Sequence, residues 1–399
     1  MLTSFEEARS LVLAHCAPLG KELRSTVEAL GRFLAEPLVA QDDSPRFDCS
    51  AVDGYGVSGE ECGDPLRLVG RAEAGSPFAG KVGAGECVRI LTGAVVPVGV
   101  AAIAMQENCR SEGDLVYIQG TVERGGNIRR RGEEYLAGAT LMPRGSLVTP
   151  PVAGLATAQG HSLVKVGKAP RVAIVTTGNE LRMPGEALGP GMVYASNALT
   201  LLGAVRALGL DADVAVTRDE PQDIATSITE AFESADLVLT TGGVSVGDRD
   251  RVRECALAVG VEELFWKVAM KPGKPVFFGV RNGKSMFGLP GNPVAATVAY
   301  HVFVRPAILR LMGAADVGTA TFPVRLDRSL RKRRGRTEFV RACLQFDEGG
   351  VLAVPTAAQG SHMITGIATA EALLHLAEDR EAYEEGEGCQ ASLLKWGVF

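Results

Sequence analysis

Between residues 171 and 260 three short apolar runs alternate with three amphipathic segments, and this alternation limits the fold more than any other feature of the sequence. Strands that are joined through helices run parallel, with right-handed crossovers. The pattern therefore predicts an α/β domain with a parallel sheet. The expected strands are 172–176, 214–217, 237–240, 275–280 and 285–288, and the expected helices are 196–209 with Ser196 as N-cap, 221–232, 250–259 and 293–312.

The flanking sequence follows other patterns. Residues 46–140 carry short apolar runs between glycine-rich turns, which is typical of a β-rich module. The last eighty residues alternate similarly, and Asp347-Glu348-Gly349-Gly350 signals a hairpin. Near the N-terminus, Thr3 with Glu6 fits a capping box. We expect helices after Thr3, over 25–34 and over 150–159, in four domains: 1–45 plus 141–168 (helical and mixed), an inserted β-rich module 46–140, an α/β domain 169–317 and a C-terminal β domain 318–399.

Charge and composition exclude several classes of protein. The chain has 41 basic and 47 acidic residues, which argues against a general nucleic-acid binder. Its longest apolar runs, 95–105 and 294–304, are about half of the ~20 residues that a membrane span needs. The eight cysteines form no C-x-x-C pair. We therefore expect a protein of the reduced cytoplasm that binds neither nucleic acid nor membrane.

Acidic residues follow each of the first three predicted strands. Glu180, Asp219 and Asp250 lie in the segments TTGNEL, TRD and GGVSVGDRD, respectively. Ligands of open parallel sheets bind at the carboxyl ends of the strands, and like charges gathered there favour a cation such as Mg²⁺. The alternative for Asp219 is a helix cap before Pro221, and Asp248 is equally placed to cap the next helix.

Further segments have the composition of anion sites. The loop 242–247 is rich in glycine, so its backbone N–H groups can approach an anion, although such loops are common. Lys267, Lys271 and Lys274 surround a Pro-Gly turn, which indicates either an oxyanion site or an edge strand protected by lysines. The basic runs 129–131 and 331–336 indicate solvated faces, a small anion or a subunit contact.

Taken together and in order, the motifs of this chain resemble those of the MoeA family of molybdopterin molybdenumtransferases, which is related to the C-terminal part of gephyrin. No single motif carries the resemblance. The matching segments are PRFDCSAVDGYGV, VRILTGAVVP, GNIRRRGEE, VTTGNEL, TTGGVSVGDRD, WKVAMKPGKP, GLPGNPVAA and AAQGSH, and they run through nearly all of the chain.

The resemblance implies an activity and an assembly. Such enzymes insert molybdate into adenylylated molybdopterin and release AMP with the help of a divalent cation, here Mg²⁺. The family has four domains, with a central α/β domain like that of the related MogA family and a small C-terminal β-barrel. It forms an elongated homodimer whose cleft lies between the α/β domain of one subunit and the β module of the other. The further partners implied are a molybdopterin adenylyltransferase that supplies the substrate and the acceptor apoenzymes.

The resemblance also implies roles for individual residues. Glu134 stands where the family usually has Asp, which leaves its part in the site open, and Asn179 replaces a frequent Asp beside Glu180. The implied catalytic residues are Asp53 and Thr92 from the partner's β module, Glu180, Asp219, Asp250, Lys267 and Lys271, with Asp250 and Glu180 as metal ligands; the implied substrate-binding residues are Gly243, Ser245, Lys271, Lys274, Arg341, Ser361, Pro290 and Asn292.

Other functions fit parts of the pattern. A gephyrin-like scaffold or a molybdopterin-binding protein without catalysis would share the fold, but three carboxylates at consecutive strand ends favour an enzyme. An adenylyltransferase would share the glycine loop and would consume ATP, whereas a molybdenumtransferase would not.

Overall fold

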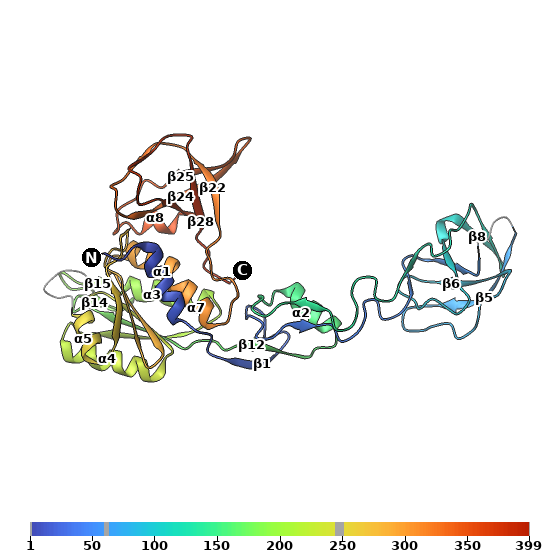
Figure 1. Ribbon diagram of the computed structural model, residues 1–399, viewed down its shortest axis with the longest axis horizontal. Helices are drawn as coiled ribbons and strands as arrows, with labels where there is room; N and C mark the ends of the chain where they lie inside the picture. Colours follow the sequence, from blue (N-terminus) through green and yellow to red (C-terminus); the bar gives the residue numbers. More distant parts are fainter. Residues whose placement is uncertain (1, 60–63, 244–250, 399) are drawn as a thin grey trace. The chain divides into compact units, whose positions relative to one another are not determined.

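The computed structural model describes residues 2–59, 64–243 and 251–398. The chain forms two compact units, each described here by itself. The larger one comprises Met1–Glu36, Arg144–Gly154 and Ser162–Phe399, and the smaller one Pro37–Pro143 and Leu155–His161 (Figure 1). The predicted fold class, multidomain α/β with a C-terminal β-barrel, is confirmed. The division into four domains stays a prediction.

A six-stranded sheet forms the centre of the larger unit, in the order β16-β13-β17-β21-β20-β18. The first four strands are parallel, as predicted, whereas β20 and β18 are antiparallel to their neighbours. The difference arises at Asn282-Gly283, where positive φ angles of 51° and 75° make a two-residue hairpin between β20 and β21. The strands are β13 (Val172–Thr177), β16 (Ala212–Thr217), β17 (Leu237–Thr241), β18 (Glu262–Trp266), β20 (Phe277–Arg281) and β21 (Lys284–Leu289).

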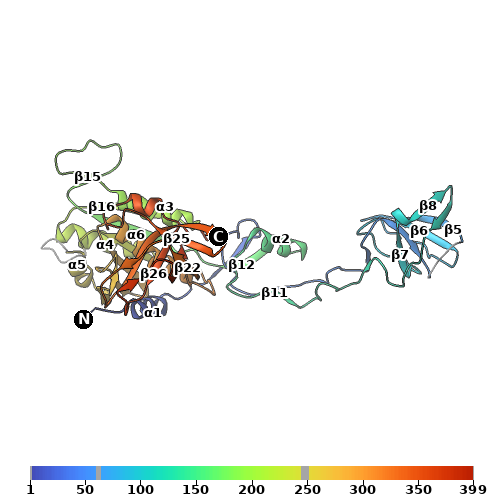
Figure 2. The same ribbon diagram turned by 90° about the horizontal axis from the view of Figure 1, so that it is seen from above.

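Helices cover both faces of this sheet (Figures 1 and 2). Successive side chains of a strand point to opposite faces, so Ile174 joins one core and Val175 the other. The first core takes up α1 (Phe5–His15), α3 (Ser196–Ala207), α6 (Pro293–Ala299), the π-helical segment η2 (Tyr300–Val304) and α7 (Arg305–Leu311); the second takes up α4 (Pro221–Ser234) and α5 (Val252–Ala258).

The run Pro293–Leu311 is long and apolar enough to cross a membrane by length and composition alone. Within its most apolar window, 94% of the residues are buried inside the protein. That burial is the pattern of a core helix.

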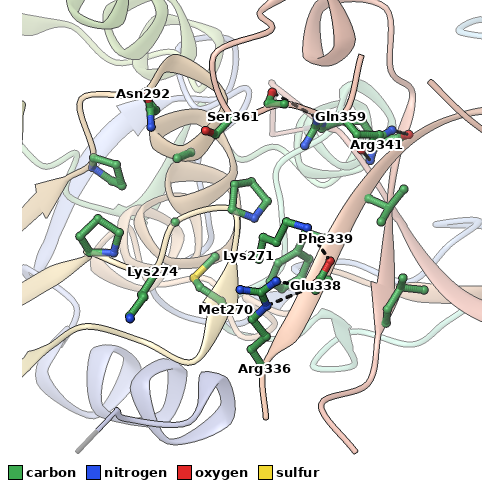
Figure 3. A pocket seen from close by; sticks show the side chains of 18 of the residues that line it. Met270, Lys271, Lys274, Asn292, Arg336, Glu338, Phe339, Arg341, Gln359 and Ser361 are labelled. Atoms are coloured by element: carbon green, nitrogen blue, oxygen red, sulfur yellow. Dashed lines mark hydrogen bonds and ion pairs between the residues drawn. The ribbon is translucent and has the colours of Figure 1, made fainter. Parts of the chain in front are cut away.

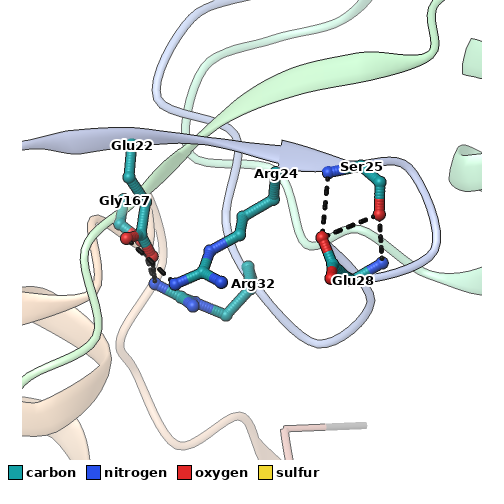
Figure 4. Close-up of polar contacts among 6 residues, drawn as sticks. All are labelled: Glu22, Arg24, Ser25, Glu28, Arg32 and Gly167. Atoms are coloured by element: carbon teal, nitrogen blue, oxygen red, sulfur yellow. Dashed lines mark hydrogen bonds and ion pairs between the residues drawn. The ribbon is translucent and has the colours of Figure 1, made fainter.

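Two N-terminal expectations were wrong. Helix α1 is capped by Ser4, whose side chain accepts a hydrogen bond from the Glu7 N–H at 3.2 Å, because Thr3 is instead paired with Val268. Residues 26–31 form turns, so the predicted helix over 25–34 is not formed. The Ser25 and Glu28 side chains do cap each other's backbone N–H groups (Figure 4). The helical turn ends there because Gly31 adopts φ +77° and donates its N–H to the Val148 carbonyl.

The segment before these turns, β1 (Lys21–Ser25), pairs with β12 (Leu163–Gly167) along its full length. Arg32 joins this ladder through Glu22 Oε1 at 2.9 Å and the Gly167 carbonyl at 2.5 Å (Figure 4). The predicted short helix near residue 150 is present as α2 (Pro150–Ala158).

A closed barrel forms the C-terminal part of the larger unit. Its strands pair in the cycle β24-β25-β22-β28-β26-β24, so the barrel leaves no free edge. The predicted hairpin is confirmed, since Asp347 pairs with Gly350. The elements are β22 (Thr321–Leu326), β23 (Leu330–Arg331), β24 (Thr337–Asp347), β25 (Gly350–Pro355), α8 (Thr365–Ala368), β26 (Ala372–Leu376), β27 (Ala382–Tyr383) and β28 (Gly388–Leu393); β19 (Met270–Lys271) joins β24 from outside the barrel.

The smaller unit is β-rich, as predicted. A six-stranded sheet in the order β7-β4-β6-β5-β9-β8 buries the side chains of Val57, Cys87 and Val116. Its elements are β4 (Gly54–Val57), β5 (Leu66–Ala72), β6 (Glu86–Ile90), β7 (Ala102–Met105), η1 (Gln106–Asn108), β8 (Cys109–Glu112) and β9 (Leu115–Ile118), with the ladders β2 (Leu38–Val39) to β11 (Thr140–Met142) and β3 (Cys49–Ser50) to β10 (Ile128–Arg129).

Candidate active site

A cleft of about 560 Å³ lies where the segment around β19 meets barrel strand β24 (Figure 3). The turn at Pro272-Gly273 and the loop before α6 form one side, and the barrel loop around Gly360 forms another. The cleft gathers predicted substrate-binding residues that are far apart in the sequence: Lys271, Lys274, Pro290, Asn292, Arg341 and Ser361.

Arg341 is the most deeply buried charged residue of the cleft, with 1% of its surface exposed. Its Nη2 donates to the Ala358 carbonyl at 2.9 Å and the Gly360 carbonyl at 3.4 Å. Within the described part of the chain, Nε has no partner and no carboxylate pairs with the guanidinium. Burial lowers the pKa of Arg341, because the charged form is poorly solvated there. An anion entering the cleft would supply the missing charge.

The opposite wall of the cleft is tied to the sheet. The Thr241 hydroxyl at the end of β17 donates to the Pro290 carbonyl at 3.3 Å. Asn197, on α3, donates from Nδ2 to the Gly291 carbonyl at 2.7 Å. The carbonyl of Ser361 in turn accepts the Val294 N–H at 3.2 Å, at the start of α6. These bonds place Asn292 and Ser361 beside each other (Figure 3).

Lys271 contacts a residue that the sequence analysis did not single out. Its Nζ lies 3.1 Å from Oε2 of Glu338, whose side chain is 6% exposed. Arg336 binds the other oxygen of that carboxylate, through Nε at 2.9 Å and Nη2 at 2.8 Å (Figure 3). The available signal for Glu338 was a carboxylate near the start of a barrel strand, and that signal does not identify its partners.

Lys267 lies apart from this cleft. Its ammonium is 3.7 Å from the centre of the Trp266 ring, and its backbone adopts φ +70°. This cation–π contact pairs Lys267 with Trp266, the last residue of β18. The structure therefore brings together two of the three predicted lysines.

Of the acidic residues predicted at the strand ends, the structure describes Glu180 and Asp219. β16, β13 and β17 are adjacent and parallel, so their carboxyl ends share one edge, as predicted. Asp219 does not cap α4, whose N-cap is Glu220. Its Oδ2 instead accepts the Asn179 N–H at 3.4 Å, and Asn179 Oδ1 accepts the Asp219 N–H at 3.3 Å. Glu180 is exposed next to this pair.

The glycine loop begins at the same edge. Gly242 has φ +90°, and a Cβ there would lie 2.7 Å from the Thr177 carbonyl oxygen; Gly243 has φ +62°. Both positions thus require glycine. The buried Thr177 hydroxyl, beside the two glycines, has no partner among the described residues. Ser245, Asp248 and Asp250 lie outside the described residues.

Among the described residues, no group of three or more His, Cys, Asp or Glu side chains is arranged to hold a metal ion. Glu180 forms no ion pair within the described part of the chain. One or two carboxylates together with substrate phosphates are a usual environment for Mg²⁺. The exposed Glu180 is compatible with such a site.

The two predicted residues of the smaller unit lie together. Asp53 Oδ1 accepts hydrogen bonds from the backbone N–H and the hydroxyl of Thr92. Glu134 is occupied elsewhere, since its Oε2 accepts the Ser44 hydroxyl at 2.7 Å. The basic run 129–131 forms ion pairs at the surface, Arg130 with Asp48 and Arg131 with Asp43.

Three family models match the chain. They are the MoeA N-terminal region (domain I and II) over residues 3–160, the “Probable molybdopterin binding domain” over 173–310, and the MoeA C-terminal region (domain IV) over 323–394.

Individual proteins match over nearly the whole length. The molybdopterin molybdenumtransferase of Haemophilus influenzae is 33% identical and covers 97% of both chains. Molybdopterin molybdenumtransferase 2 of Mycobacterium tuberculosis is 36% identical over 91% of this chain and 92% of its own length. The crystal structure of the molybdopterin biosynthesis moeA protein from Pyrococcus horikoshii OT3 is 28% identical, with a TM-score of 0.85 over 98% of this chain and 100% of that one.

Proposed function

Because the chain belongs to the MoeA family of molybdopterin molybdenumtransferases, we propose that it transfers molybdate to adenylylated molybdopterin and releases AMP in a Mg²⁺-dependent reaction. The chain is a transferase of molybdenum cofactor biosynthesis. The adenylylated substrate, the release of AMP and the requirement for Mg²⁺ are the proposal.

The buried Arg341 carries the proposal. The Arg341 guanidinium is 1% exposed and pairs with no described carboxylate. Burying such a charge destabilises the fold unless an anion enters its site. Molybdate is a tetrahedral dianion, and Arg341, Lys274 and the Ser361 hydroxyl are donors suited to it. Lys271 adds a second ammonium group at the same cleft.

The adenylate is assigned to the carboxyl edge of the parallel sheet. Backbone N–H groups of a glycine loop bind phosphates, and Gly242 and Gly243 adopt the left-handed conformations that such a loop needs. We assign Gly243 and Ser245 to the adenylate, and Glu180 and Asp250 to the cation. When bound, Mg²⁺ would supply positive charge to the phosphate oxygens.

The chain's own residues then have separate tasks in the reaction. Lys271, Lys274 and Arg341 hold the oxyanion and stabilise negative charge that develops as the phosphoanhydride breaks. We assign Asp219, whose carboxylate accepts the Asn179 N–H, to positioning the attacking oxygen. The metal ion being transferred is bound by the dithiolene of the substrate.

We also propose that the active enzyme is a homodimer with composite sites, in which Asp53 and Thr92 of one subunit complete the cleft of the other. Both residues match site motifs, and the Thr92 donors fix the carboxylate of Asp53. The adenylyltransferase that supplies the substrate and the acceptor apoenzymes are proposed as transient partners, and the cytoplasm as their common compartment.

The test is AMP release by the purified protein with adenylylated molybdopterin, molybdate and Mg²⁺. We expect AMP formation without any consumption of ATP. Lys274→Ala removes one charge-assisted hydrogen bond, which is worth about 1.5–3 kcal/mol, so the KM for molybdate should rise by about one to two decades. Lys395→Ala, at an exposed position, is the matched control. A protein that binds molybdopterin but never releases AMP would be a scaffold instead.

A further inference from the structure

More positive than negative side chains line the cleft. Among the described residues, the cleft has five cationic side chains and one carboxylate: Lys271, Lys274, Arg331, Arg336, Arg341 and Glu338. Like charges at such a site repel one another and favour orientations that point away into water. The position of the single carboxylate therefore decides which cations stay in the cleft.

Glu338 is held rigidly at this position. Its strand, β24, pairs in parallel with β19, and the register places Lys271 opposite Glu338. The next residue, Phe339, is 1% exposed and packs edge-on against Phe5, with ring centres 5.0 Å apart. Glu338 thus comes from the buried core of the unit, whereas the side chain of Lys271 is 53% exposed. The exposed partner is the lysine, and the buried partner is the carboxylate.

We propose, in an inference that rests on the proposed function, that Glu338 is a positioning residue. It orients the ammonium of Lys271 toward the bound oxyanion. An ammonium group has three N–H donors. Oε2 of Glu338 takes one of them at 3.1 Å, which leaves two for a ligand. Oε1 is occupied by Arg336 at 2.9 Å, so the carboxylate holds two cations at the wall of the cleft.

Stability alone does not account for this arrangement. Replacing a buried ion pair by apolar side chains is often neutral or stabilising, because the charges lose their hydration on burial. A barrel strand could therefore carry an apolar residue at position 338. The carboxylate has a use that an apolar side chain lacks, since it prevents Lys271 from turning into solvent.

The test compares Glu338→Gln, which keeps the shape, with Glu338→Asp, which keeps the charge. Calorimetric titration with molybdate alone gives the affinity of the oxyanion site, and AMP release gives kcat and the two KM values. We expect Glu338→Gln to raise the Kd and the KM for molybdate by about tenfold, with the KM for adenylylated molybdopterin unchanged. Glu338→Asp should recover most of the affinity. Glu263→Gln, which breaks the ion pair with Arg253 away from the cleft, should leave the Kd unchanged.

A double-mutant cycle separates positioning from a merely structural role. If Glu338 acts through Lys271, then Lys271→Ala with Glu338→Gln binds molybdate no more weakly than Lys271→Ala alone. Additive losses, or a Glu338→Gln protein with the molybdate affinity of the wild type, would overturn the proposal. Wild-type protein that binds molybdate but releases no AMP would overturn the proposed reaction and leave the role of Glu338 standing. Wild-type protein that binds no molybdate would overturn both.

Discussion

The Asp53 carboxylate accepts two hydrogen bonds from Thr92 on a single oxygen, one from the backbone N–H at 2.7 Å and one from the hydroxyl at 2.8 Å. Both bonds favour the ionised form of the acid. The backbone bond and then the hydroxyl bond lower the pKa of Asp53 below its ordinary value. The site therefore keeps this carboxylate charged and oriented in the smaller unit.

Thr92→Val removes one of these two donors, so we expect the pKa of Asp53 to rise toward its ordinary value. A carboxylate whose pKa is lowered by folding stabilises the fold above its unfolded pKa, and this contribution is lost as the pH falls through the folded pKa. An NMR titration of the carboxylate carbon measures the shift. Thr92→Ser keeps the hydroxyl and should keep the lowered pKa. An unchanged pKa in Thr92→Val would show that the backbone bond alone controls Asp53.

Mixed dimers test the composite site. Asp53→Asn chains and Lys274→Ala chains should each have little activity, because every site in either homodimer contains a defect. A heterodimer of the two has one intact site if residues of both subunits form it. We therefore expect AMP release to recover on mixing, measured on heterodimers purified through two different tags. Heterodimers that stay inactive would place Asp53 and Lys274 in the same site of a single chain.

Gly242→Ala should damage the predicted adenylate site through the backbone. The added Cβ would lie 2.7 Å from the Thr177 carbonyl oxygen, at a φ of +90°. Gly209→Ala is the matched control, because Gly209 has φ +75° but nothing within 4 Å of an added Cβ. We expect the control to lose about 1 kcal/mol of unfolding free energy, and Gly242→Ala to lose more and to bind AMP more weakly. Urea denaturation and AMP titration measure the two effects, and equal behaviour of the variants would contradict the prediction.

Because His301 is buried, we expect the protein to lose stability in acid. Burial lowers the pKa of His301 to about 4, and its Nε2 lies 3.0 Å from the Leu393 carbonyl. Because the unfolded chain takes up the proton near pH 6.5, stability is fully present above that pH and falls as the pH drops from 6.5 to about 4. The loss amounts to roughly 3 kcal/mol.

His301→Gln keeps a donor but does not titrate, so its unfolding free energy should fall less steeply over this pH range. Burial also lowers the pKa of His375 to about 4, so His375 accounts for the pH dependence of the unfolding free energy that remains in this variant. Urea denaturation at several pH values measures both slopes.

Local periodicity and turn chemistry allowed much of the fold to be predicted. The alternation of strands and helices after residue 171 and the hairpin at Asp347 to Gly350 are both present, because each depends on neighbouring residues. Local patterns were insufficient at residues 25–34. There a capping pair begins a helical turn, but the Gly31 N–H bonds to Val148 and ends it.

The sequence by itself therefore determined which segments form the sheet and which residue types lie at its edge. Tertiary structure alone decided that Glu338 meets Lys271 across 67 residues of chain, and that Arg341 is buried without a described carboxylate partner. The physical reason is that a contact between distant residues depends on the register of strands and on burial, which are properties of the whole packed unit. A pattern of neighbours along the chain does not show which distant segments come into contact.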